Sequence, residues 1–285
     1  MTSAALDTGF TSAPPRSPAV ALVERIAGGL PTVGISRVTG DLALLARVDQ
    51  KYVVPLPTLE RLLELVRDDI EVLEIDGLRC FQYETTYFDT PDLMTFRAHA
   101  QGRRRRYKVR VRSYLDSGES MLEVKLKGGR GETLKRRLPY HHRSGEPLSA
   151  KAHAFASEII GRAYGIGVPE VLSPTVTTTT NRLTLVSARA TARMTVDMDL
   201  ECLTAAGGIG LRDDHVVVET KAAGGDGRLD RALRLLGARP VSLSKYCLGV
   251  AVLHDDVSGN RWHRTARSYF VPHSPVANNF LSRMP

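Results

Sequence analysis

Cationic side chains occupy alternate positions of the stretch RRRYKVRVRSY, residues 104–114. Side chains of an extended strand point alternately to its two faces, so this spacing gathers the cations on one face. That face carries Arg104, Arg106, Lys108, Arg110 and Arg112, whereas the opposite face carries Tyr107, Val109 and Val111. Guanidinium and ammonium groups arrayed in this way can bind an acidic partner through charge-assisted hydrogen bonds, and the charge alone does not separate nucleic acid, a membrane surface and a small polyphosphate. The stretch therefore predicts a strand with one apolar face and one anion-binding face.

Four further segments show the same alternation of charged and apolar positions. Their charged faces carry Glu123, Lys125 and Lys127; Arg193, Asp197 and Asp199; Glu219 and Lys221; and Arg47, Asp49 and Lys51. A single such strand is explained by a sheet with one face in water. Taken together the segments are unusual, because a solvated face usually mixes neutral polar residues and both charges. If helices cover the apolar faces, we expect the sheet to curl into a barrel whose charged faces line a tunnel.

A tunnel lined by unpaired cations is unstable when it is empty, because each isolated buried charge costs several kcal/mol. We therefore expect a resident polyanion, with a metal ion to balance the remaining charge. The same argument predicts that truncating one of these cations, as in Arg110→Ala or Arg193→Ala, leaves the fold intact or stabilises it.

Three segments have the spacing of amphipathic helices, at residues 58–69, 147–164 and 228–236. Many strands and few helices predict an α+β fold, in which an antiparallel barrel encloses a basic tunnel and helices pack outside. We place this domain at residues 37–254. Residues 1–36 are expected to form a flexible leader and residues 255–285 a C-terminal tail.

The chain has 285 residues and a formal net charge of +8, from 39 Lys and Arg against 31 Asp and Glu. Hydrophobic residues make up 42%, enough for a packed core. There is no apolar run long enough to span a bilayer and no signal peptide, so we expect a cytoplasmic protein. The three cysteines are far apart and odd in number, which argues against a disulfide framework or a zinc site.

Several blocks, in this order along the chain, resemble the VTC domain of polyphosphate polymerases, a branch of the triphosphate tunnel metalloenzyme (CYTH-like) superfamily. The blocks are RVDQKYVV, YFDTPDLMTF, YKVRVRSY, MLEVKLKGG, NRL, ARMTVDMDL, VVVETKA and SLSKY. The resemblance implies an antiparallel barrel around a basic tunnel. It also implies a transferase that makes linear polyphosphate from the γ-phosphate of ATP, with Mn²⁺ or Mg²⁺ and release of ADP.

The resemblance also implies roles for individual residues. The catalytic phosphate-binding residues would be Lys51, Arg110, Arg112, Lys125, Arg182, Arg193 and Lys245, and the metal ligand would be Glu219. Ser244 is also N-cap of a predicted helix that begins there. We assign Lys127, Lys221 and Ser244 to ligand binding as well. After the YFDT block, either Arg97 or His99 could supply a further phosphate contact.

Two alternatives share the same tunnel. Attack by water would make the protein a triphosphatase, but triphosphatases of the superfamily usually begin with a strand that carries two glutamates, and this chain has Arg47 and Asp49 before Lys51. The other alternative is a non-catalytic module that binds polyphosphate. RNA is disfavoured as a partner, because valine rather than a stacking aromatic separates the cations and aromatics make up only 6% of the chain. We therefore expect ATP and polyphosphate or triphosphate as ligands, with no nucleic acid and no membrane span.

Overall fold

The computed structural model describes residues 17–39, 47–129, 133–142, 145–188, 192–223, 227–254, 257 and 260–273. The first part of the expected leader, residues 1–16, and the end of the expected tail, residues 274–285, lie outside these ranges.

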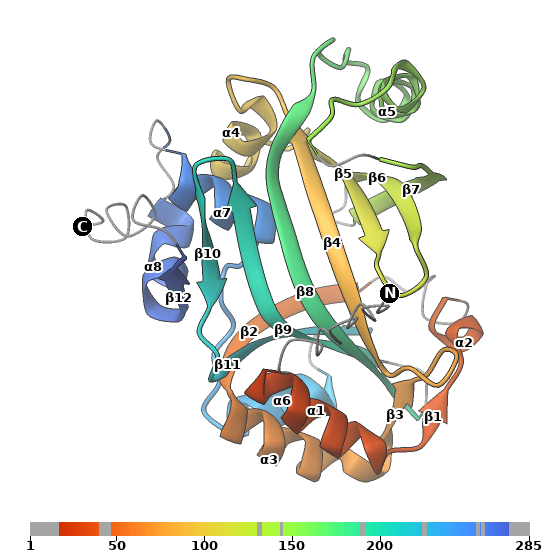
Figure 1. The fold of residues 1–285 in the computed structure, drawn as a ribbon, viewed down its shortest axis with the longest axis vertical. Helices are drawn as coiled ribbons and strands as arrows, with labels where there is room; N and C mark the ends of the chain where they lie inside the picture. The colour runs from red at the N-terminus through yellow and green to blue at the C-terminus, as the bar shows by residue number, and fades with distance from the viewer. Residues whose placement is uncertain are drawn as a thin grey trace, which may run out of the picture.

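A single large sheet dominates the fold (Figure 1). Its strands are β1 (Thr32–Val33), β2 (Arg47–Pro55), β3 (Ile70–Leu73), β4 (Cys80–Asp89), β5 (Tyr107–Tyr114), β6 (Glu119–Lys127), β7 (Thr133–Pro139), β8 (Ser173–Ser187), β9 (Ala192–Thr204), β10 (Gly207–Leu211), β11 (His215–Ala223) and β12 (Phe270–Pro272). One continuous path runs β2-β11-β9-β8-β4-β5-β6-β7, and every pair along it is antiparallel. The α+β fold with a large antiparallel sheet is thus confirmed.

The sheet is strongly twisted: in Figure 1, β2 and β11 run across the direction of β4 and β8. The backbone hydrogen bonds of the described strands do not close it into a barrel, since β2 pairs only with β11 and β7 only with β6. In the part of the chain that the structure covers, the sheet is therefore open and twisted, and its two edge strands on this path are β2 and β7.

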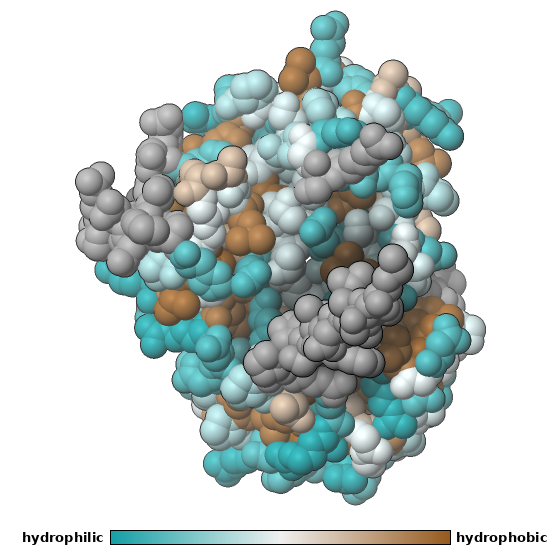
Figure 2. Space-filling view, viewed as in Figure 1, coloured by the Kyte–Doolittle hydropathy of each residue, from teal (hydrophilic) through white to brown (hydrophobic). Residues whose placement is uncertain are grey.

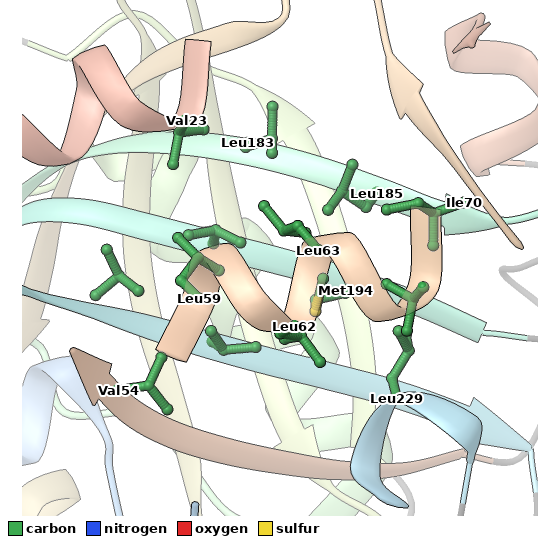
Figure 3. Close-up of a cluster of buried hydrophobic side chains, with 14 of the residues drawn as sticks. Val23, Val54, Leu59, Leu62, Leu63, Ile70, Leu183, Leu185, Met194 and Leu229 are labelled. Carbon is green, nitrogen blue, oxygen red and sulfur yellow. The ribbon is translucent and has the colours of Figure 1, made fainter. Parts of the chain in front are cut away.

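Helices α1 (Pro18–Gly28), α3 (Leu56–Val66) and α6 (Arg228–Leu235) cover the apolar side of the β2, β8, β9 and β11 region (Figure 3). Leu59, Leu62 and Leu63 of α3 pack there against Leu185 and Met194 of the sheet. A short 3₁₀ turn, Arg67–Asp69, extends α3, so the helix expected at residues 58–69 is confirmed with a shifted start. Although α1 falls in the expected leader, it buries four side chains, and Ser17 caps its first turn.

Helix α5 (Ala150–Tyr164) covers the apolar side of β5 and β6. It begins three residues later than the expected segment at residue 147, because Ser149 accepts a hydrogen bond from the amide of Ala152 as N-cap. It ends at Gly165, whose positive φ favours glycine. The helices at residues 58–69, 147–164 and 228–236 are therefore all present with small shifts of their ends.

A second group of helices packs on the other side of the sheet. These are α4 (Met94–Ala100), α7 (Lys245–Leu253) and α8 (Asn260–Tyr269), while α2 (Ile35–Thr39) is a short turn elsewhere. Residues of helix α7 share one buried hydrophobic cluster with Val53 and Val217, which lie on the same strand faces as the predicted charged residues. It therefore covers part of the face on which the cations lie. No helix in the described ranges is long and apolar enough to cross a membrane.

Most of the surface on the viewed side of the molecule is hydrophilic, with hydrophobic side chains scattered among the polar ones (Figure 2). Leu235 of α6 is the most exposed large hydrophobic residue that the structure describes, at 84%. The chemistry of the protein must therefore be sought among its polar and charged groups.

Candidate functional site

The strand register places the predicted charged residues on one continuous side of the sheet. Lys51 pairs with Glu219, Lys221 with Arg193, and Asp197 with Arg182, while Arg110 pairs with Glu123 further along. Directly opposite residues in an antiparallel pair share a face. We call the set the cationic face, and its members are Lys51, Lys108, Arg110, Arg112, Glu123, Lys125, Lys127, Lys135, Arg137, Arg182, Arg193, Asp197, Glu219 and Lys221.

Glu123 is the centre of the first cluster on this face. It is fully buried, and its Oε2 accepts hydrogen bonds from Nε and Nη2 of Arg110 at 2.8 and 2.5 Å. Its other oxygen lies 3.4 Å from Nζ of Lys135. Arg110 also donates to the hydroxyl of Tyr87 at 3.1 Å. Burial favours neutral Glu123, but Arg110 and the neighbouring cations outweigh it and hold the pKa of this carboxyl well below its usual range.

Asp197 organises the second cluster in the same way. Its two oxygens accept a forked pair of hydrogen bonds from Nε and Nη2 of Arg182, at 2.5 and 2.8 Å, and Nζ of Lys245 lies 2.8 Å from the second oxygen. A forked arginine–carboxylate pair is fixed in orientation as well as in position. Residues from β8, β9 and α7 are thereby brought together around one carboxylate.

The N-terminus of α7 faces this cluster. Ser244 caps the helix by accepting from the amide of Cys247, and Nζ of Lys108 donates to the same hydroxyl oxygen at 2.9 Å. Tyr246 donates its hydroxyl hydrogen to the buried carboxylate of Asp89, which also accepts from the amides of Thr95 and Phe96. The YFDT and SLSKY blocks are therefore in direct contact, and this contact fixes the start of α7 beside the cationic face.

Arg112 and Lys125 differ from these paired cations. Neither forms an ion pair with a carboxylate of the described residues; Arg112 donates only to the hydroxyl of Thr85 and lies over the ring of Tyr83. Burial, followed by repulsion from Arg110 and Arg182, lowers the pKa of Arg112 to about 10. Repulsion from Arg110 is the main cause that lowers the pKa of Lys125. Both groups would be stabilised by an anion placed between them.

Glu219 is the carboxylate that could hold a metal ion. Its oxygens lie 2.7 Å from Nζ of Lys221 and 3.6 Å from Nζ of Lys51, and its side chain is 18% exposed, whereas Asp197 is 2% exposed and Glu123 fully buried. Burial alone would raise the pKa of Glu219, but the charges of Lys51 and Lys221 lower it by more. The pKa therefore lies well below its usual range, and the carboxyl group is ionised. Within the described ranges no three Asp, Glu, His or Cys side chains form a ligand cluster. A hard cation bound here would have Glu219 as its one carboxylate ligand among the described residues and would need phosphate oxygens to complete its coordination, a mode that Mg²⁺ often uses.

One residue, Asp199, differs from the sequence-based expectation, and the choice between Arg97 and His99 stays open. Asp199 is not aligned with Asp197, because the β8–β9 register shifts there, its φ is +50°, and its carboxylate accepts from the amide of Asn181. Arg97 is exposed and donates to the carbonyl of Asp92. His99 contacts the Thr95 carbonyl, and burial, then Lys108, lowers its pKa to about 3, so it is neutral at neutral pH. Both lie on α4 rather than on the strands of the cationic face.

Strand β7 was not expected from the sequence. Its residues Lys135 and Arg137 pair with Lys125 and Glu123 and add two cations to the face. Every residue of β7 except Leu138 is exposed, so the strand lacks the buried apolar face that identified the others. The alternation of Lys135 and Arg137 in TLKRRLP was the available signal.

The carboxyl groups of Glu123 and Asp197 should make the fold sensitive to acid. A carboxyl group whose pKa is lowered by folding stabilises the folded protein at pH values above the pKa it has in the unfolded chain. This stabilisation is lost as the pH falls toward the pKa of the folded protein. The ordinary values are 4.5 for glutamate and 3.8 for aspartate. We therefore expect the free energy of unfolding to decrease below about pH 5. Urea unfolding at a series of pH values measures this, and Asp197→Asn should show a smaller decrease than the parent protein. Equal slopes for the two proteins would contradict the role of Asp197.

Comparison with known proteins gives a family for most of the chain. Residues 46–254 match the family model described as VTC domain. No curated protein sequence matches the chain. Among solved structures, the PH1012 protein from Pyrococcus horikoshii OT3 shares 12% identity with a TM-score of 0.39, covering 71% of this chain and 99% of that one. HpAC1 from Hippeastrum, described as having a dominant triphosphatase activity, shares 12% identity with a TM-score of 0.42, covering 72% of this chain and 96% of that one.

Proposed function

The chain belongs to the VTC domain family, and we propose that it is a polyphosphate polymerase that transfers the γ-phosphate of ATP to a growing polyphosphate chain. The observation that carries the proposal is the pair Arg112 and Lys125. They are half-buried cations on a shared face, repel Arg110, and form no ion pair with a described carboxylate. A bound chain of phosphate groups would relieve this repulsion along the whole face.

The proposed reaction is an in-line displacement. An oxygen of the terminal phosphate of the chain, or of orthophosphate at the start, forms a bond to the γ-phosphorus, and the bond from that phosphorus to the β-γ bridging oxygen breaks. The electron pair leaves with ADP. Because the attacking phosphate is already ionised, the protein does not need to remove a proton from it. The protein needs to position the two phosphates and to neutralise their negative charge.

The cationic face has the groups for this task. Arg182 uses Nε and Nη2 for Asp197, which leaves Nη1 to donate to a phosphate oxygen. Arg112 offers a guanidinium without a carboxylate partner, and Lys51, Lys125 and Lys245 add point charges. Arg193, Lys127 and Lys221 would continue the phosphate-binding surface along the strands. A divalent cation such as Mn²⁺ or Mg²⁺, held by Glu219 and phosphate oxygens, would neutralise charge on the phosphates.

We also propose that the sheet and α7 together enclose this face as a tunnel. Three features support this: the sheet is twisted, α1, α3, α5 and α6 occupy its apolar side, and α7 lies on the cationic side next to Asp197. Enclosure would exclude water from the γ-phosphate, which favours transfer to phosphate over hydrolysis.

Incubation of the purified protein with ATP and Mn²⁺ tests the proposal. We expect a phosphatase-resistant polymer on a polyphosphate gel, with ADP formed in equal amount to the phosphate incorporated. Formation of orthophosphate without polymer would show a triphosphatase. Stabilisation by triphosphate with no turnover of ATP would show a module that binds polyphosphate without catalysis.

A further inference from the structure

A run of four arginines lies just outside the cationic face. Arg103, Arg104, Arg105 and Arg106 connect α4 to β5, and we call them the arginine loop. The first three are exposed and Arg106 is half-buried. Their hydrogen bonds are to neutral groups: Nε of Arg103 donates to Gln101 at 2.7 Å, and Nη1 of Arg106 donates to the carbonyl of Arg103 at 2.5 Å. None of the four forms an ion pair with a carboxylate that the structure describes.

The backbone holds the arginine loop in a fixed place relative to the site. The carbonyl of Arg106 accepts from the amide of Lys127 at 3.1 Å and from the hydroxyl of Tyr164 at 2.9 Å. Tyr164 also donates to the carbonyl of Lys127, so α5 ties the start of β5 to the end of β6. Because Arg106 precedes Lys108 with strand spacing, the loop continues the line of cations that passes along β5.

The two ends of the β5–β6 hairpin carry opposite charges. The arginine loop and Lys127 lie at the end near α4 and α5, whereas the turn at the other end carries the exposed carboxylates of Asp116 and Glu119 (Figure 1). The electrostatic potential along the hairpin therefore favours a polyanion at the arginine end and disfavours it at the turn. A chain of phosphates longer than the cationic face would leave it toward the arginines.

On the basis of the proposed function, we propose that the arginine loop is a second polyphosphate-binding surface, which holds the growing chain after it leaves the cationic face. Exposed guanidinium groups can bind phosphate oxygens in forked pairs without the cost of burying a charge. Residues 101–106 are glutamine, glycine and arginines, with no aromatic ring on which a base could stack. This composition favours an inorganic polyphosphate chain over RNA.

The affinity of the protein for preformed polyphosphate, measured in the absence of ATP, tests the inference. The variant is Arg103→Ala/Arg104→Ala/Arg105→Ala. Its matched control is Arg61→Ala/Arg231→Ala/Arg239→Ala, which removes three exposed arginines on or next to α3 and α6, at the opposite end of the molecule in Figure 1. We expect the loop variant to bind long-chain polyphosphate roughly tenfold more weakly at low salt, because each exposed charge contributes modestly. Its salt dependence should decrease as well, while its affinity for triphosphate should equal that of the parent.

The control variant should bind both ligands as the parent does. Equal loss of long-chain affinity in the two variants would overturn the inference in favour of a general effect of net charge. Equal loss for triphosphate would show that the loop belongs to the cationic face itself, and preferential loss of RNA over polyphosphate would assign the loop to nucleic acid. If the parent makes no polymer from ATP but the loop variant alone loses long-chain binding, the proposed polymerase fails and the binding surface stands.

Discussion

Arg110→Ala should abolish polyphosphate synthesis and also lower the free energy of unfolding by about 3 kcal/mol. Arg110 supplies two hydrogen bonds to Glu123, which is fully buried. Without the guanidinium, Lys135 at 3.4 Å is the remaining ion-pair partner of that carboxylate among the described residues, and Arg112 and Lys125 act on it only from further away. A buried charge that loses its main partner is strongly destabilising, whereas the gain from reduced repulsion on Lys125 is smaller. The structure thus replaces the expectation that this truncation leaves the fold intact or stabilises it.

Two further variants separate the effect on synthesis from the effect on stability. Arg110→Met/Glu123→Leu removes both charges and keeps the volume, so it should recover most of the lost stability and still make no polymer. Arg110→Lys keeps a charge but not the fork, and should remain strongly impaired in synthesis. Urea unfolding and a polyphosphate gel measure the two quantities on the same preparations. Recovery of synthesis in the double variant would mean that Arg110 acts only through the fold.

The faces of the strands could be predicted from the sequence because alternation depends only on local geometry. Val109, Val111, Leu122 and Val124 are buried at 1% exposure or less, as the period of two requires. The apolar stripe of α3 was readable for the same reason, since it repeats with the period of a helix.

The pairs of charges on those faces could not be predicted, because they depend on register between strands. Arg110 and Glu123 meet only because β5 and β6 pair with Tyr107 opposite Leu126. Asp199 departs from its expected face through a register shift that no local pattern reveals. The contact of Tyr246 with Asp89 joins segments separated by 157 positions, and it depends on how α7 docks. Many arrangements of the strands can accommodate the same charged residues. The packing of the apolar residues on the opposite face therefore decides which charged residues become partners.

Glu219→Gln should leave triphosphate binding intact or tighter and reduce turnover by at least about a hundredfold, with loss of the response to Mn²⁺. The substitution keeps the size of the side chain and removes its charge. Lys51 and Lys221 then lose a carboxylate that holds them, so more positive charge becomes available to phosphate. At the same time the proposed metal ligand loses its negative charge and one of its two oxygens, because the amide keeps only Oε1. Binding and catalysis should therefore respond in opposite directions.

Asp49→Asn is the matched control for Glu219→Gln. Asp49 accepts from the same Nζ of Lys221 at 2.8 Å, but its side chain is 39% exposed and lies at the end of the network. Asp49→Asn takes one carboxylate partner away from Lys221 but leaves the proposed metal ligand in place. Turnover should therefore decrease only modestly, and the Mn²⁺ titration should match that of the parent. Calorimetric Mn²⁺ binding in the presence of triphosphate gives a second readout that does not depend on turnover. If Glu219→Gln behaves like Asp49→Asn in both measurements, Glu219 only balances charge, and Asp197 becomes the next candidate ligand because it is the remaining carboxylate beside Arg182.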